Sequence, residues 1–552
     1  MMNCQLPNAD CDSTVLDREA QTRRELAEVQ MKCDAAPSSH IRTSASSVEP
    51  HSAFGIRQSA FTLVEVMISI AIALVLILGI SQIFSLAQQA TGAGMAVLSA
   101  TEQTRGAQQR FLEDFRYMDN GTDSPGLVIT SYSVAAFRNR ADYIGNNAGT
   151  ATPMQMNNLV TGTGSVTAGT AITTNSRIHR VDRAVFWARN LFYRQTSDPP
   201  NLTSTTSSDE AMIWLGHVDL PYNTTIANWT DTAVDSGNYY PPGVTPVTTN
   251  QNNFFASDWI LGREVMLLIP TPPDINYYPG VPTTPVPTSA TVSPLSLLAP
   301  AKSVTGTAVK LNASRYDLAA TSISALRQFL ATRGTTASAG GYWWEELSGV
   351  KMTAAGSPTI KTDVRYWANP FLKKPGSTGD ANWMSAAAAQ TYPVFARGCT
   401  QFIVEFAGNF LTQDDNPTDT AYGNVLAGKP DPTGKIDFVI DPATKARHIR
   451  WYGFPRDLNG DGVIDAVHDV APVATSNGGT PLLFERAVPA NYTLTASGTT
   501  PPTSQAYQCA WGPDTDAYGI PRPRMIRITM ALDDPGGHLN TEQVYQYVYD
   551  LP

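Results

Sequence analysis

The segment RQSAFTLVEVMISIAIALVLILGI, residues 57–80, is a nearly unbroken apolar run with one acidic residue, Glu65, close to its start. As a helix, residues 61–80 would be roughly 30 Å long, which matches the hydrocarbon core of a bilayer. Thirteen of these positions are Phe, Leu, Ile or Val. Each contributes on the order of −0.3 to −0.6 kcal/mol to insertion, whereas one acidic residue costs about 3 kcal/mol. The sequence therefore predicts a transmembrane helix that tolerates Glu65 at a cost.

A charged group inside a membrane segment indicates a function and a partner of opposite charge. No Lys or Arg lies between Arg57 and Arg105, so the segment supplies no cationic side chain. A chain cut just before Phe61 would gain an α-amino group four residues from Glu65, on the same helix face. Neighbouring helices shifted by about one turn could then pair amine with carboxylate. The alternative is an uncut signal anchor in which the acid is incidental.

The sequence SA followed by FTLVEV resembles the cleavage and methylation motif of type IV prepilins and type II secretion pseudopilins. The resemblance implies that prepilin peptidase cuts between Ala60 and Phe61 and methylates the new amine, and that Glu65 guides assembly with other pilin or pseudopilin subunits. Ala60 departs from the usual Gly before the cut. The resemblance also implies a single-pass inner-membrane protein with an extracytoplasmic head, in the periplasm or at the cell surface.

Helical spacing continues from residue 81 to about residue 118, and QRFLEDFRYM at its end resembles J-type minor pseudopilins and W-type minor pilins. Gly92 and Gly94 are expected to loosen the helix, and the Asp-Asn-Gly sequence at 119–121 to end it. Apolar residues three, four or seven positions apart predict one buried stripe: Met95, Leu98, Phe111, Leu112, Phe115 and Met118.

Beyond this helix, alternation of apolar and polar residues predicts antiparallel strands. RMIRITMALDD and EQVYQYVYDL predict a terminal hairpin over residues 524–551. Further strands are expected at 264–269, 401–406, 435–441 and 448–454, and a helix at 317–333 before Gly334. We expect an α+β fold, with a long N-terminal helix packed on a large, mainly antiparallel β head in the lollipop form of the pilin family.

These features divide the chain into consecutive parts. We expect a leader at residues 1–60 that is removed, or a leader of 30 residues if translation starts at Met31. The remaining parts are the transmembrane half of the helix (61–80), its amphipathic half (81–119), a β-rich, Thr- and Pro-rich inserted region (120–300) and a C-terminal α+β head (301–552).

Two of the five cysteines, Cys399 and Cys509, follow the apolar run. If that run separates a reducing from an oxidising compartment, these two thiols can form a disulfide. The alternative is a pair of unpaired buried thiols, because the sequence does not fix the distance between them.

The stretch DLNGDGVIDAVHD, residues 457–469, resembles an EF-hand-like calcium loop. Position 12 holds His468 in place of the usual bidentate Glu, although Asp469 could substitute in a variant loop. The alternative is a polar turn between strands. The candidate Ca²⁺ ligands at positions 1, 3, 5 and 9, with the turn glycine at position 6, are Asp457, Asn459, Asp461, Asp465 and Gly462.

The net charge of −10, without blocks of like charge, argues against nucleic acid as the main partner. No Gly-x-Ser-x-Gly, Walker or Cys-x-x-Cys motif occurs, so nothing nominates an enzyme active site. The arginines of residues 177–194 form either a basic patch for a partner or a solvated face above aromatic anchors.

The sequence thus predicts a structural subunit of a type IV pilus or a type II secretion pseudopilus. The large head favours a minor, tip-proximal subunit, since a bulky domain repeated along a filament would crowd its neighbours. The alternative is a surface adhesin or ligand-binding protein anchored by a pilin stem.

Overall fold

The chain divides into two compact units, Met1–Gly79 and Ile80–Pro552. The computed structural model describes residues 62–138, 176–195, 205–218, 220–221, 239–240, 255–269, 318–319, 321–335, 342–352, 358–360, 394–454, 482–487, 507–539 and 541–552.

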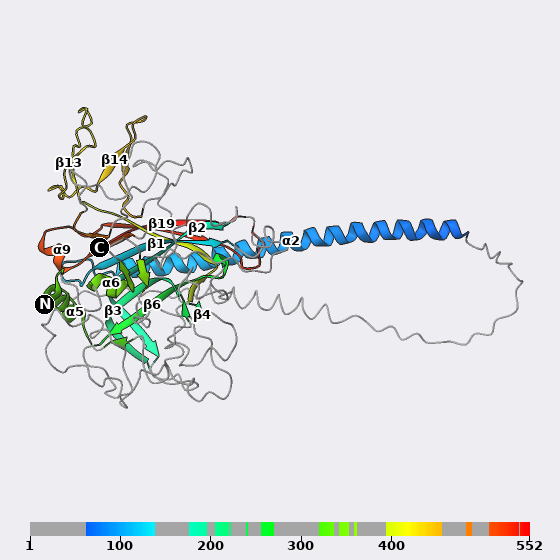
Figure 1. The fold of residues 1–552 in the computed structure, drawn as a ribbon, viewed down its shortest axis with the longest axis horizontal. Helices are drawn as coiled ribbons and strands as arrows, with labels where there is room; N and C mark the ends of the chain where they lie inside the picture. The colour runs from blue at the N-terminus through cyan, green and yellow to red at the C-terminus, as the bar shows by residue number, and fades with distance from the viewer. Residues whose placement is uncertain are drawn as a thin grey trace, which may run out of the picture. The chain divides into compact units, whose positions relative to one another are not determined.

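The N-terminal helix α2 (Leu63–Arg116) runs for 54 residues and is the long blue helix in Figure 1. Thr62 caps its start, because the backbone N–H of Glu65 donates to the Thr62 hydroxyl at 3.3 Å and to its carbonyl oxygen at 2.9 Å. The helix is continuous through Gly92 and Gly94. The helix ends at Arg116, shortly before the Asp-Asn-Gly sequence at 119–121 that predicts its end.

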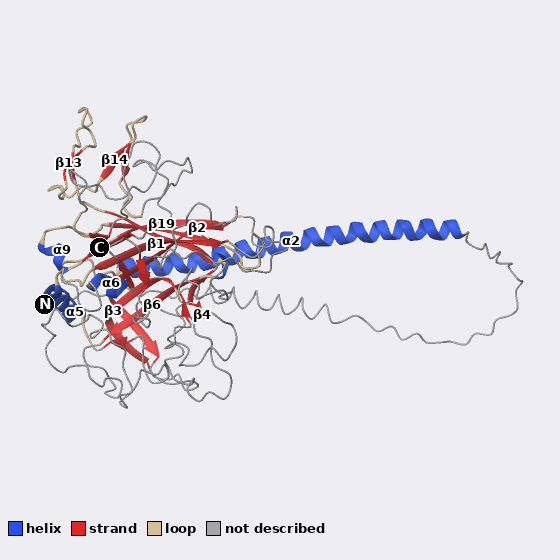
Figure 2. Ribbon diagram, viewed as in Figure 1, coloured by secondary structure: helices blue, strands red, loops and turns tan. Residues whose placement is uncertain are grey.

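One sheet of 11 strands dominates the second unit, with the path order β10-β6-β3-β2-β1-β17-β16. β11 pairs with β2 and β18, β18 pairs with β19, and β7 pairs with β6. Among the described strands of this sheet, only the β11–β2 and β6–β7 pairings are parallel. A long helix and a mainly antiparallel sheet confirm the predicted α+β class (Figure 2). The strands are β1 (Leu127–Phe137), β2 (Ser176–Gln195), β3 (Thr205–His217), β6 (Ile260–Leu268), β7 (Leu318–Ala319), β10 (Val394–Arg397), β11 (Cys399–Ala407), β16 (Glu485–Ala487), β17 (Tyr507–Trp511), β18 (Met525–Leu532) and β19 (Gln543–Asp550).

Strands from both sides of residue 300 belong to this one sheet. The expected boundary between an inserted region (120–300) and a C-terminal head (301–552) therefore does not separate two sheets. In the described part of the chain, both ranges build the same head.

The smaller elements surround the main sheet. The predicted helix at 317–333 is confirmed in its C-terminal part, where Ser322 accepts a hydrogen bond from Ala325 N at 3.1 Å and Gly334 follows the last turn. The helices are η3 (Ala256–Asp258), α5 (Ile323–Arg333), α6 (Trp343–Ser348) and α9 (Pro513–Ala517). Two-stranded sheets pair β4 (Leu220–Pro221) with β5 (Tyr239–Tyr240), β8 (Val350–Met352) with β9 (Pro358–Ile360), β12 (Thr412–Gln413) with β13 (Val425–Ala427), and β14 (Phe438–Ile440) with β15 (Arg447–Ile449).

The predicted terminal hairpin is confirmed: β18 and β19 pair antiparallel from Met525 opposite Asp550 to Leu532 opposite Gln543. Along β19 the tyrosines are partly or fully buried, and the residues between them are exposed. This alternation is the one the sequence predicts.

The hydrophobic core of the head lies between the C-terminal part of α2 and the large sheet. The Phe111 ring centroid lies 4.9 Å from that of Phe395 in β10 and 6.3 Å from that of Tyr549 in β19. Phe115 stacks on Phe186 of β2 at 5.2 Å. Rings from three strands thus fix this part of the helix.

The buried carboxylate of Asp437 links three core residues of the segment 408–454. This carboxylate accepts hydrogen bonds from Phe410 N at 3.0 Å, from Leu411 N at 3.1 Å and from the Tyr452 hydroxyl. Burial raises the pKa of Asp437 to about 6, although these hydrogen bonds oppose the shift. The ionised form of this group therefore weakens the fold.

For Cys399 and Cys509 the structure agrees with the second of the two alternatives, a pair of unpaired buried thiols. Cys399 and Cys509 are both free and buried, and their thiols donate to backbone carbonyls of Gln401 and Ile129 instead of joining. They sit on β11 and β17, which are not neighbours in the sheet, so the predicted disulfide is not formed.

Two arginines of β2 lie in the interior of the head, whereas Arg189 is exposed and pairs with Asp119 at 2.9 Å. Arg183 is fully buried and donates to the Ser348 carbonyl at 3.2 Å. Arg180 is also buried and pairs with Asp182 at 2.8 Å.

Candidate assembly site

The first part of α2 presents an apolar surface to its surroundings. Every residue from 62 to 79 is exposed, including large side chains such as Leu63, Val75 and Leu78. Among the described residues, α2 is the one helix long and apolar enough to cross a membrane. Its first part therefore needs lipid or other helices to cover it.

Glu65 lies in the first turn of α2 and is exposed. The pattern Thr62-x-x-Glu65 is that of a capping box, and an acidic residue in the first turn is favoured by the helix dipole. Ser69 donates its hydroxyl proton to the Glu65 carbonyl oxygen at 2.8 Å. The backbone of Glu65 thus takes part in the hydrogen bonds of the helix start. The cleavage residues Ala60 and Phe61 lie outside the described residues.

The C-terminal part of α2 buries a face of mostly small residues. The predicted stripe is confirmed at Phe111, Phe115 and Met118, which are buried. It is wrong at Met95 and Leu98, which are exposed. Leu112 is exposed as well. The buried face comprises Ala100, Thr104, Ala107, Phe111, Asp114 and Phe115.

Strand β19 contacts the C-terminal part of α2. The Tyr545 hydroxyl lies 3.4 Å from the Thr101 hydroxyl, and the Tyr549 hydroxyl donates to the Gln108 carbonyl at 3.3 Å. The contacts advance along both elements together, so β19 runs parallel to α2. The Tyr549 ring also packs against Phe111 and Phe115, with centroids 6.3 and 5.3 Å apart.

One acid lies on the buried face of α2. Asp114 is 3% exposed and accepts two hydrogen bonds, each 2.6 Å long, from Arg263 of β6. Burial raises the pKa of Asp114, and the guanidinium opposes that shift. The sequence signal was an acid three positions after Phe111, which puts both on one helical face.

Gly92 marks where the hairpin loop between β18 and β19 reaches α2. A Cβ at this position would lie 2.6 Å from Cδ2 of His538, whereas a Cβ at Gly94 would meet nothing within 4 Å. His538 is held in place by Asp534, whose carboxylate lies 2.5 Å from Nδ1. Gly92 thus permits a close contact between the helix and this loop.

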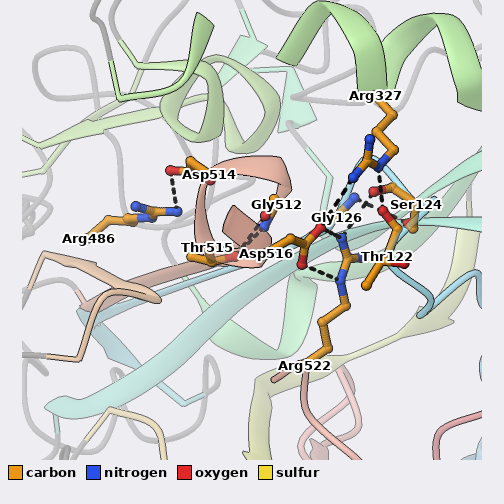
Figure 3. A network of polar contacts seen from close by, with 10 residues as sticks. All are labelled: Thr122, Ser124, Gly126, Arg327, Arg486, Gly512, Asp514, Thr515, Asp516 and Arg522. Carbon is orange, nitrogen blue, oxygen red and sulfur yellow. Dashed lines mark hydrogen bonds and ion pairs between the residues drawn. The ribbon is translucent and has the colours of Figure 1, made fainter. Parts of the chain in front are cut away.

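A polar network fixes the turn between α2 and β1 (Figure 3). Asp516 of α9 accepts from Arg522 at 2.9 Å and lies 3.9 Å from Arg327 of α5. The same arginines donate to carbonyl oxygens of the turn, Arg522 to Ser124 at 3.0 Å and Arg327 to Thr122. The end of α2 is thereby linked to α5 and to the β17–β18 connection.

No group of three or more His, Cys, Asp or Glu side chains within the described ranges is arranged to hold a metal ion. The predicted calcium loop at 457–469 lies outside those ranges.

Residues 56–81 match the family model of the prokaryotic N-terminal methylation motif. No curated protein and no solved structure matches the chain. The match is consistent with the type IV prepilin-like family and supports a type IV pilin-like or pseudopilin-like protein. The motif implies processing by prepilin peptidase and assembly with other pilins, and points to a structural subunit. With α2, it is consistent with a single-pass membrane-anchored pilin.

Proposed function

We propose that the protein is a minor pilin or pseudopilin, cleaved between Ala60 and Phe61 and built into a type IV pilus or a type II secretion pseudopilus. The main support for this function is the difference between the first and the last part of α2. Its first part is apolar and wholly exposed, and its last part is locked into a large head. A helix with these two parts is suited to insert a stem among other helices while displaying a head outside the cytoplasm.

In this proposal Glu65 sets the axial position of the subunit. The carboxylate is exposed at the helix start, so the α-amino group of a neighbouring processed subunit can approach it. Pairing would offset the cost of an acid in an apolar environment.

The test is incorporation of Glu65→Ala into filaments sheared from the native host, measured by immunoblot. We expect its amount to fall at least about tenfold, with membrane levels unchanged. The matched control is Glu102→Ala, an exposed acid of α2 beyond the apolar run, which should assemble like the wild type. Equal incorporation of both variants would exclude the proposed role of Glu65.

We also propose that residues 457–469 bind Ca²⁺, supported by the spacing of their oxygen ligands. Added Ca²⁺ should raise the melting temperature of the wild type but not of Asp461→Ala. A Ca²⁺ response that survives in the variant would count against this loop.

A further inference from the structure

A cavity of about 360 Å³ opens on the head between the end of α2, the end of β2 and strand β6. We call it the β2 pocket. Pockets for small molecules typically measure about 300–1,000 Å³, so this one admits a small ligand or the end of a larger one. The lining residues that bear on its chemistry are Arg110, Glu113, Asp114, Tyr117, Tyr193 and Arg263.

Two tyrosines give the pocket aromatic surface. Tyr117, directly after α2, is 39% exposed, and Tyr193 of β2 is 62% exposed. The Arg116 guanidinium lies 5.8 Å from the Tyr117 ring centroid, whereas no described ring or cation stacks on Tyr193. The face of an aromatic ring is negative and attracts polarised C–H groups. Tyr193 therefore offers a stacking surface for a ligand with an apolar C–H face.

Polar atoms in the pocket retain both donors and acceptors. Arg263 binds Asp114 through Nε and Nη2, each at 2.6 Å, and its Nη1 has no partner among the described residues. Glu113 binds Arg110 through Oε2 at 2.8 Å, and its Oε1 likewise has no described partner. A hydroxyl group donates and accepts at once, so a ligand with several hydroxyls can use both kinds of atom.

Charge in the pocket is balanced, because two arginines face two acids. Asp114 is 3% exposed, so a charged ligand that displaced Arg263 would leave a buried acid without its partner. An acidic ligand would also be repelled by Glu113, and a basic one by Arg110. The pocket therefore favours an uncharged ligand.

We propose that the β2 pocket binds a neutral sugar, with the C–H face of one ring against Tyr193 and its hydroxyl groups on Arg263 Nη1 and Glu113 Oε1. A sugar ring combines an apolar C–H face with hydroxyls that donate and accept, which is the combination that the lining residues can satisfy. The inference does not depend on cleavage at Ala60 or on filament assembly.

The test uses the fluorescently labelled full-length protein in lipid nanodiscs and an array of neutral sugars, together with acidic sugars that carry a carboxylate. We expect neutral sugars to bind above the level of empty nanodiscs. The best neutral sugar and its carboxylated form are then titrated in solution by calorimetry. The carboxylated form should bind at least about tenfold more weakly, because the pocket leaves its charge unpaired.

One variant locates the binding. Tyr193→Ala should weaken binding of the best neutral sugar at least about fivefold, because the ring face is lost. The matched control is Tyr518→Ala, which removes a tyrosine that is 70% exposed and lies outside the pocket, and it should bind like the wild type. Both variants change exposed side chains and should melt within a few degrees of the wild type.

A second variant tests the charge balance. Glu113→Gln keeps a side-chain oxygen but removes one negative charge, so the neutral sugar should bind within about threefold of the wild type. The carboxylated sugar should bind more tightly to this variant than to the wild type. Glu102→Gln, an exposed acid of α2 outside the pocket, should change neither affinity.

Three results would overturn the proposal. One is the absence of any neutral sugar that binds above the level of empty nanodiscs. Another is equal binding of the best neutral sugar by Tyr193→Ala and the wild type. The third is tighter binding of the carboxylated sugar than of the neutral one by the wild type, which would assign the pocket to an anion.

Discussion

The two ends of α2 share one secondary structure but differ in what covers them. Residues 62–79 are apolar and exposed along their whole length, whereas from Ala100 to Phe115 one face is buried by the sheet. The buried face uses small residues, two phenylalanines and an ion-paired acid in place of large aliphatic side chains.

The difference teaches that apolar character alone does not identify the packed face of this helix. No described residue of the chain covers the first part, whereas tyrosines and an arginine of the chain's own strands cover the last part. Substitutions on the buried face and on the exposed face of the last part should therefore change the free energy of unfolding by different amounts.

The largest effect is expected for Phe111→Ala, which removes a buried ring from between three strands. Loss of burial and the cavity left behind should lower the free energy of unfolding by about 3–5 kcal/mol. Leu112→Ala, its exposed neighbour, should change it by less than about 0.5 kcal/mol. Denaturant titration in a mild detergent gives both values. Similar losses for the two would mean that the faces are misassigned.

The next effect is expected for Arg263→Ala, which leaves Asp114 buried without its partner. The destabilisation should be about 3 kcal/mol by the same titration. Arg110→Ala removes a solvent-exposed ion pair on the same helix and should cost less than about 1 kcal/mol. A small loss for Arg263→Ala would show that Asp114 does not need the ion pair to remain in the core.

The stability of the head should depend on pH through Asp437. The pKa of Asp437 is raised from 3.8 to about 6, so the folded state holds a proton that the unfolded state has released. Stability relative to Asp437→Asn should therefore fall as pH rises from about 4 to 6, by on the order of 1–3 kcal/mol, and then level off. Melting temperatures of both proteins across this range measure the difference.

Asp431 should show the opposite pH dependence. Its pKa is lowered by hydrogen bonds from Thr433, so the stability that its carboxylate contributes is present above the unfolded-state pKa and is lost as pH falls. The difference between the wild type and Asp431→Asn should shrink on acidification. The same pH slope for both aspartate variants would disprove the assigned burial of Asp437.

The smallest effect separates two glycines of α2. Gly94→Ala should stabilise the helix by about 0.5–1 kcal/mol, because nothing lies within 4 Å of the new methyl group. Gly92→Ala should lose that gain, since its methyl group would meet His538. Thermal melts of the two variants measure the gap, and equal melting temperatures would refute the contact.

Features set by local sequence were predictable. The long helix, its end, the alternating terminal hairpin and the helix before Gly334 all follow from periodicity and capping residues. The position of Glu65 near the helix start also follows from the sequence.

Features set by distant partners were not predictable. The buried face of α2 depends on Tyr549 and Arg263, which lie far away in the sequence. The relation between Cys399 and Cys509 depends on strand order, which spacing does not reveal. The bulge of β2 at Asn190 and Leu191 has no sequence signature of its own.

The most direct test of the account is mass spectrometry of the N-terminal peptide of the protein purified from membranes of its native host. If proteolysis turns the apolar part of α2 into an assembly element, the peptide begins with N-methylated Phe61. A mature protein that retains Ala60 and the residues before it would contradict the account.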